Sequence, residues 1–198
     1  GFTGWSQLEL GCSTADSAHF SCFPGLESQG SQDNQMHIPS THGYQVIIRQ
    51  GDTYTISGGT VPGNNDFTAY IPQNGSSTRG YLSVNQENTP RGVTICEISY
   101  DSIARSWSLI SSQPVDFSHD SIVTTERNCS GGITPWGTVV TAEETGNTAN
   151  TNNDGYHDVG WLVEIDPATA QIVDHNNDGH PDKLFAMGKM NHENVAFS

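Results

Sequence analysis

The feature that most restricts the fold is a series of short apolar or alternating runs, separated by turn residues, that begins near Gly43. Such runs are typical of β-strands, whereas an amphipathic helix needs a sustained 3.6-residue period, which no window shows. We therefore predict an all-β chain with few, short helices, the best helix candidate being Asp101–Arg105. The expected strands are Tyr44–Arg49, Tyr54–Ile56, Phe67–Ile71, Gly80–Val84, Val93–Tyr100, Ser106–Ser111, Ser121–Thr125, Trp136–Thr141, Gly160–Ile165 and Lys183–Ala186.

Many short strands are compatible with a sandwich, a barrel or the blades of a propeller, and their spacing does not choose among these. A propeller blade uses ~45 residues or more, so a chain of this length would supply about three to four blades. That is fewer than a closed ring usually contains. If the fold is a propeller, we expect a partial one, completed by more of the protein, by another chain or by self-association.

The net charge disfavours two classes of partner. Seven basic residues stand against 22 acidic ones, and the formal net charge is −15. Such a chain repels nucleic acid and anionic membrane surfaces, and metal cations are its natural counterions. No run of about 18 apolar residues is present, so we expect no membrane span.

Residues 1–42 differ from the rest of the chain, because Ser, Gly and Gln are frequent and apolar residues show no clear period. We expect an N-terminal arm here and the main domain over residues 43–198. Cys12 and Cys22 either form a disulfide or remain two free thiols. The close cysteine pair and the acidic composition favour an exported protein, at the cell surface, in the periplasm or outside the cell, over a cytosolic one.

Two acidic segments, residues 150–158 and 174–182, repeat one spacing. Oxygen-bearing side chains stand at positions 1, 3, 5 and 9, a glycine stands at position 6, and position 7 offers its carbonyl, which is a donor set that Ca²⁺ selects. Neither segment has the Glu at position 12 of an EF-hand, and both are more similar to the acidic loops of thrombospondin-type repeats. Plain surface turns are the alternative, but the repetition favours two structural calcium sites. The predicted ligands are Asn150, Asn152, Asp154, Tyr156 and Asp158 in the first loop and Asp174, Asn176, Asp178, His180 and Asp182 in the second.

Residues 128–144 combine features that a plain strand does not need. Cys129 precedes two glycines that we expect to let the backbone turn tightly, and Pro135-Trp136-Gly137 is expected to form a rigid corner. A β run then ends in the adjacent carboxylates Glu143 and Glu144. Successive strand side chains point to opposite faces, so both can serve one site only if the strand ends or bulges there. The segment is either a solvated acidic turn or a set of metal ligands.

The string Cys129-Ser-Gly-Gly-Ile-Thr-Pro-Trp-Gly-Thr-Val-Val-Thr-Ala-Glu143-Glu144 resembles the signature of PhoX-type alkaline phosphatases. In that family a cysteine, paired glycines, Thr-Pro-Trp-Gly-Thr and a double glutamate recur in this order. Further stretches are similar to the family in the same order, and together they extend over residues 43–198. They are Asn64–Phe67, Gly80–Asn88, Gly92–Ile98, Gly160–Pro167 and His192–Asn194.

The resemblance implies a β-propeller-like domain whose centre holds two ferric ions, bridged by a cysteine thiolate, and several calcium ions. It implies Cys129 as the iron ligand, with Glu144 and Glu193 as further metal ligands and catalytic residues, and Glu143 and Glu87 as weaker candidates. The implied function is metal-dependent hydrolysis of a phosphomonoester, by this chain or by a protein of which it is the N-terminal part. The alternative is a non-catalytic, calcium-stabilised extracellular module that assembles with copies of itself or with other chains.

Overall fold

The computed structural model describes residues 33, 35–39, 42–89 and 92–198. The chain divides into two compact units, Gly1–Gln45 and Val46–Ser198, and every strand described lies in the second. The cysteines of the predicted Cys12–Cys22 disulfide, and most of the predicted N-terminal arm, lie outside the described residues. No helix in the described part of the chain is long and apolar enough to cross a membrane.

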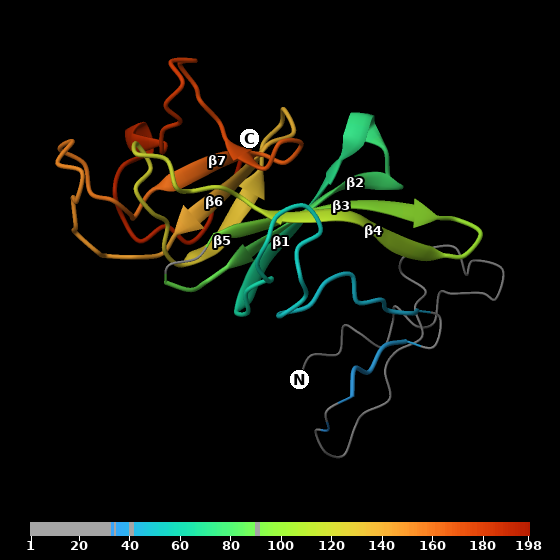
Figure 1. Cartoon of the computed structure of the whole chain (residues 1–198). Coiled ribbons are helices and arrows are strands. Elements are labelled where there is room, and N and C mark those ends of the chain that lie inside the picture. Colours follow the sequence, from blue (N-terminus) through green and yellow to red (C-terminus); the bar gives the residue numbers. More distant parts are fainter. Residues whose placement is uncertain (1–32, 34, 40–41, 90–91) are drawn as a thin grey trace, which may run out of the picture. The chain divides into compact units, whose positions relative to one another are not determined.

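Two four-stranded antiparallel sheets make up the second unit, and in each sheet the strands follow chain order (Figure 1). The first sheet contains β1 (Asn65–Pro72), β2 (Arg79–Gln86), β3 (Val93–Asp101) and β4 (Ser106–Pro114). The second contains β5 (Asn128–Ile133), β6 (Val139–Glu143), β7 (Leu162–Asp166) and β8 (Gln171–Ile172). Two short 3₁₀ turns, η2 (Gln73–Gly75) and η3 (Phe185–Met187), are the helical elements of the described chain. The prediction of an all-β fold with few, short helices is confirmed.

Strands β6 and β7 are buried on both faces. Every residue of β6 is buried, and so are the first four residues of β7. Val163 and Ile165 of β7 belong to the same buried cluster as Val93 and Ile95 of β3, so the two sheets share one core. Because both strands are covered on both sides, their residues do not alternate between buried and exposed. They also bury polar side chains, namely Thr141 and Glu143 in β6 and Glu164 in β7.

Four of the expected strands are not strands in the structure. Residues 121–125 form a turn and an extended segment, in which the amides of Ile122 and Val123 donate to the His119 carbonyl. Ile122 is nevertheless 1% exposed, so this apolar run is buried without pairing in a sheet. The other three segments without a strand are Tyr44–Arg49, Tyr54–Ile56 and Lys183–Ala186.

The helix expected at Asp101–Arg105 is also wrong, because these residues form the tight connection between β3 and β4. The Asp101 carboxylate accepts hydrogen bonds from the amides of Ile103 and Ala104, and Arg105 has a φ of 52°. An Asp that binds amides two and three residues ahead favours a turn.

The shared core generates a stability prediction. Replacing Ile165, which is 0% exposed, by Ala should lower the free energy of unfolding by about 2–5 kcal/mol, because the substitution leaves a cavity between the sheets. The control is Ile103→Ala, since Ile103 is 95% exposed, and this change should stay within about 0.5 kcal/mol. Urea unfolding measures both, and equal losses would contradict the shared core.

Candidate metal centre and acidic loops

Cys129 lies on β5 and is held there by a residue from the other sheet. The side-chain amide of Asn85, on β2, donates to the carbonyls of Cys129 and Ser130 at 3.1 and 3.0 Å and to the Thr141 hydroxyl at 3.0 Å. Asn85 is fully buried, so these bonds are shielded from water. The position of the cysteine therefore depends on the contact between the two sheets.

The paired glycines after Cys129 provide clearance and do not form the predicted turn. Gly131 and Gly132 lie within β5, and neither has a positive φ. A Cβ atom on Gly131 would overlap the Val140 carbonyl oxygen, and one on Gly132 would lie 2.8 Å from the Val195 carbonyl oxygen. Gly131 thus leaves room for β6, and Gly132 allows the C-terminal segment to pass close over β5.

That close passage brings Glu193 to the cysteine. The Cys129 Sγ lies 3.3 Å from the His192 carbonyl oxygen and 4.0 Å from Glu193 Oε2. Burial raises the pKa of the Cys129 thiol, and the carboxylates of Glu193, Glu144 and Asp66 raise it further. In these surroundings the thiolate is disfavoured unless a cation is bound beside it.

Arg127 joins two more of the predicted ligands. Its guanidinium lies 2.6 Å from Glu87 Oε1 and 2.7 Å from Glu144 Oε2, and the two carboxylates raise the pKa of Arg127. The backbone carbonyl of Arg127 also accepts the Glu144 amide, at 3.0 Å. The structure therefore groups Glu87 with Glu144 around Arg127, and Cys129 with Glu193.

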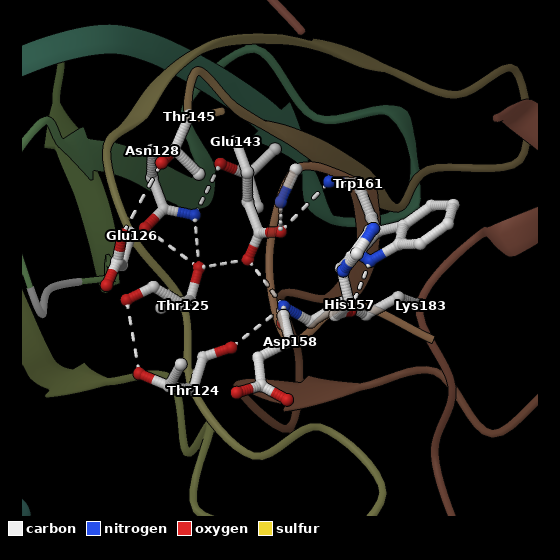
Figure 2. Close-up of polar contacts among 12 residues, drawn as sticks. Thr124, Thr125, Glu126, Asn128, Glu143, Thr145, His157, Asp158, Trp161 and Lys183 are labelled. Atoms are coloured by element: carbon white, nitrogen blue, oxygen red, sulfur yellow. Dashed lines mark hydrogen bonds and ion pairs between the residues drawn. The ribbon is translucent and has the colours of Figure 1, made fainter. Parts of the chain in front are cut away.

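Glu143, the other half of the glutamate pair, lies in a buried polar cluster (Figure 2). Its Oε1 accepts hydrogen bonds from the Lys183 ammonium at 2.7 Å and the Thr125 hydroxyl at 2.8 Å. Its Oε2 accepts the amides of Gly160 and Trp161 at 2.9 and 3.0 Å. Protein donors thus bind both carboxylate oxygens of Glu143. This arrangement is typical of a residue that stabilises the fold and not of a metal ligand.

Lys183 was missed by sequence reasoning, which assigned it only to a strand. Its ammonium donates to Glu143 and to the carbonyls of Asp158, at 2.6 Å, and Thr124, at 2.8 Å. Burial lowers the pKa of Lys183, and the Glu143 carboxylate opposes that shift. We call Lys183, Glu143 and the groups that bind them the Lys183 cluster.

The two acidic loops adopt the same backbone conformation, as their repeated spacing suggests. Position 4 has a φ near 60° in both, at Asn153 and Asn177, and the glycines at position 6 also have positive φ. In both loops the carboxylate at position 5 accepts the amide at position 7 at 2.8 Å. The two loops are therefore alike in backbone conformation as well as in sequence.

Position 1 of each loop carries an oxygen suited to a cation. Asn150 Oδ1 and Asp174 Oδ1 are buried atoms without a hydrogen-bond partner in the described structure. Buried polar atoms are normally paired, so an unpaired one at the same place in both loops fits a missing ligand. In the second loop, burial and the carboxylates of Asp178 and Asp174 raise the pKa of Asp182. A bound divalent cation would relieve that repulsion.

No three His, Cys, Asp or Glu side chains in the described chain converge closely enough to form a finished metal site. The predicted ligands therefore lie in two separate groups, and their side chains would have to move to share one ion. The two acidic loops are not covered by this test, because their expected donors include Asn side-chain oxygens and backbone carbonyls as well as Asp carboxylates.

Comparisons with known proteins agree with this architecture. The paired four-stranded antiparallel sheets place the chain in the class of β-propeller-type folds. The sequence profile of the family described as "Alkaline phosphatase PhoX" matches residues 97–198, which is more than half of the chain. The chain belongs to this family, which confirms the resemblance seen in the sequence.

A solved structure to which the chain is similar is "Pseudomonas fluorescens PhoX in complex with vanadate, a transition state analogue". The match has a TM-score of 0.55 and 17% sequence identity and covers 81% of this chain and 43% of that one. At this identity the likeness shows the fold, and the chain spans less than half the length of that protein. None of the curated proteins matches the chain.

The different places of the two glutamates generate a prediction. Glu143→Ala should lower the free energy of unfolding by about 3–5 kcal/mol, because it leaves the Lys183 ammonium buried without its counter-charge. Glu144→Ala should cost much less, since its ion pair with Arg127 is partly exposed to solvent. Urea unfolding of the two variants makes the comparison, and a similar loss in both would show that Glu143 has no special structural role.

Proposed function

We propose that the chain is a metal-dependent phosphomonoesterase of the alkaline phosphatase type, or part of one. The observation that carries the proposal is that Cys129 lies beside Glu193, with the carboxylates of Glu144 and Asp66 near enough to raise its pKa. These groups come from segments far apart in the sequence. Membership of the alkaline phosphatase family supports the same reading.

The donor chemistry suits iron. A thiolate with carboxylates can hold ferric ions, so Cys129, Glu144 and Glu193 would be the ligands, with Glu87 as a further candidate. Glu143 is a weaker candidate, because its oxygens are already bound by protein donors. Bound metal would polarise a phosphoryl oxygen and orient or activate the attacking oxygen.

Arg127 has the chemistry to bind the substrate's phosphoryl group. Its planar guanidinium is suited to two oxygens at once, and here it already holds one oxygen from each of two carboxylates. If metal ions bound Glu87 and Glu144, the guanidinium would be released toward an anionic substrate. The same residue would thus offset acidic charge in the free chain and attract phosphate in the loaded one.

We propose calcium as the second cofactor, at both acidic loops. The repeated conformation and the unpaired buried oxygens of Asn150 and Asp174 support this assignment. Calcium would have a structural role there, because it fixes loops that make few apolar contacts and offsets the repulsion among their carboxylates. An exported location, where calcium is plentiful, is consistent with the acidic composition of the chain.

The second candidate function belongs to another class: a non-catalytic, calcium-stabilised extracellular module that assembles with copies of itself or with other chains. The observation that favours it is the lack of a finished three-residue metal site among the described residues. On this reading the loops bind calcium and the cysteine is a buried structural thiol.

Metal analysis of two cysteine variants separates the two functions. The wild-type chain, loaded with iron and calcium, should retain iron and hydrolyse an aryl phosphate at alkaline pH. Cys129→Ala should lose both iron and turnover while keeping calcium. Cys96→Ala is the matched control, because Cys96 is also a free, buried thiol but lies on β3, and this variant should keep its iron. Calcium without iron, and no turnover in the wild type, would favour the second function.

Calcium should also stabilise the chain. A site filled at 100 times its Kd adds about 2.7 kcal/mol, so calcium should raise Tm and a chelator should reverse the change. Asp178→Ala should remove the part of the Tm shift that the second loop contributes. Asp101→Ala is the control, since Asp101 also accepts turn amides but is the last residue of β3. A Tm shift that Asp178→Ala leaves intact would exclude calcium from that loop.

A further inference from the structure

The Lys183 cluster lies where the two acidic loops end. Lys183 directly follows Asp182, the last predicted ligand of the second loop. Its ammonium donates at 2.6 Å to the carbonyl of Asp158, the last predicted ligand of the first loop. One buried side chain therefore joins the final ligand positions of both loops.

Glu143 holds the exit of the first loop from the other side. Its Oε2 accepts the amides of Gly160 and Trp161, which follow Asp158 in the chain. The Trp161 indole in turn donates to the His157 carbonyl at 2.7 Å, inside the loop. The end of the first loop is thus fixed by both members of the ion pair.

The exit of the second loop is fixed as closely. The Leu184 amide donates to the Leu162 carbonyl at 2.9 Å, which ties the residue after Lys183 to β7. The Ser121 hydroxyl donates to the Pro181 carbonyl at 2.6 Å, one residue before Asp182. A shift of Asp182 would therefore disturb Lys183 and its contact with the first loop.

From these contacts we infer that Lys183 is a positioning residue, whose buried ion pair with Glu143 couples the two loops so that calcium bound at one strengthens calcium binding at the other. The inference rests on the calcium part of the proposed function. A buried pair with every donor and acceptor used has few alternative arrangements, so ordering one loop orders the ion pair that the other loop needs. Such coupling acts equally in both directions.

A second contact also joins the loops and must be separated from the first. The rings of Tyr156, in the first loop, and Phe185, after the second, are stacked with centroids 4.2 Å apart. The Tyr156 side chain is exposed, however, whereas Lys183 and Glu143 are buried. We therefore assign the coupling to the ion pair.

Calcium titration calorimetry on the whole chain tests the coupling. Asp154→Ala silences the first loop and Asp178→Ala the second, so each variant reports the affinity of the loop that remains. In the wild-type background, silencing either loop should weaken calcium binding at the other about fivefold or more. With Lys183→Met and Glu143→Gln introduced together, which removes both charges at once, that effect should fall below about twofold.

Two controls test whether the coupling depends on the Lys183–Glu143 ion pair in particular. Arg79→Met with Glu97→Gln removes a surface ion pair of 2.7 Å between β2 and β3 and should leave the coupling unchanged. Phe185→Leu, which removes the aromatic stack, should also leave it unchanged. Loss of coupling in Phe185→Leu together with its retention in the Lys183→Met, Glu143→Gln variant would overturn the inference.

A measurement on the unaltered chain covers the case in which the charge-free variant does not fold. Calcium should slow hydrogen exchange of the Gly160 and Trp161 amides, and Asp178→Ala should reduce that protection although it lies in the other loop. Two loops that bind calcium independently would overturn the coupling alone. No calcium binding at either loop would overturn the calcium proposal with it.

Discussion

The ion pair between Lys183 and Glu143 is the interaction on which the arrangement of the second sheet and both loops depends. Each charge loses its hydration when it is buried, and that cost is offset only where geometry and further hydrogen bonds are complete. Here the ammonium has three acceptors and the carboxylate has four donors. Their further partners come from the segment before β5, the end of the first loop and the two residues before β7. The ion pair is complete only when all of these segments are in their native positions.

The candidate centre depends on a second set of close approaches, those between the two sheets. Asn85 fixes the β5 backbone from β2, and Gly131 and Gly132 leave room for β6 and the C-terminal segment. Glu144 lies one residue beyond Glu143, and its amide is bound by the Arg127 carbonyl. Two successive residues at the end of β6 therefore belong to different sites. Glu143 belongs to the Lys183 cluster and is held by protein donors, whereas Glu144 belongs to the candidate centre and is held by its ion pair with Arg127.

The sequence predicted those features whose signal is local. Strands β3 and β4 follow from alternation, and the two loops from a nine-residue spacing that the structure reproduces as one backbone conformation. Strand β5 was missed because Asn128–Ile133 contains two glycines and little β-forming character. Residues 121–125 were misassigned because Ile122 is buried by a turn. Lys183 gives no local signal, since its partners lie 25, 40 and 59 residues away in the chain.

Charge links the candidate centre to the loops. Burial, and secondarily nearby carboxylates, disfavour ionisation of the Cys129 thiol and of the Asp182 carboxyl. At the centre, Arg127 offsets part of the negative charge through its ion pairs with Glu87 and Glu144. The proposed cation binding would be thermodynamically linked to folding, because a cation that binds only the folded state stabilises it. The two proposed functions share the proposed calcium at the loops, and they differ in whether Cys129 and Glu193 would hold iron.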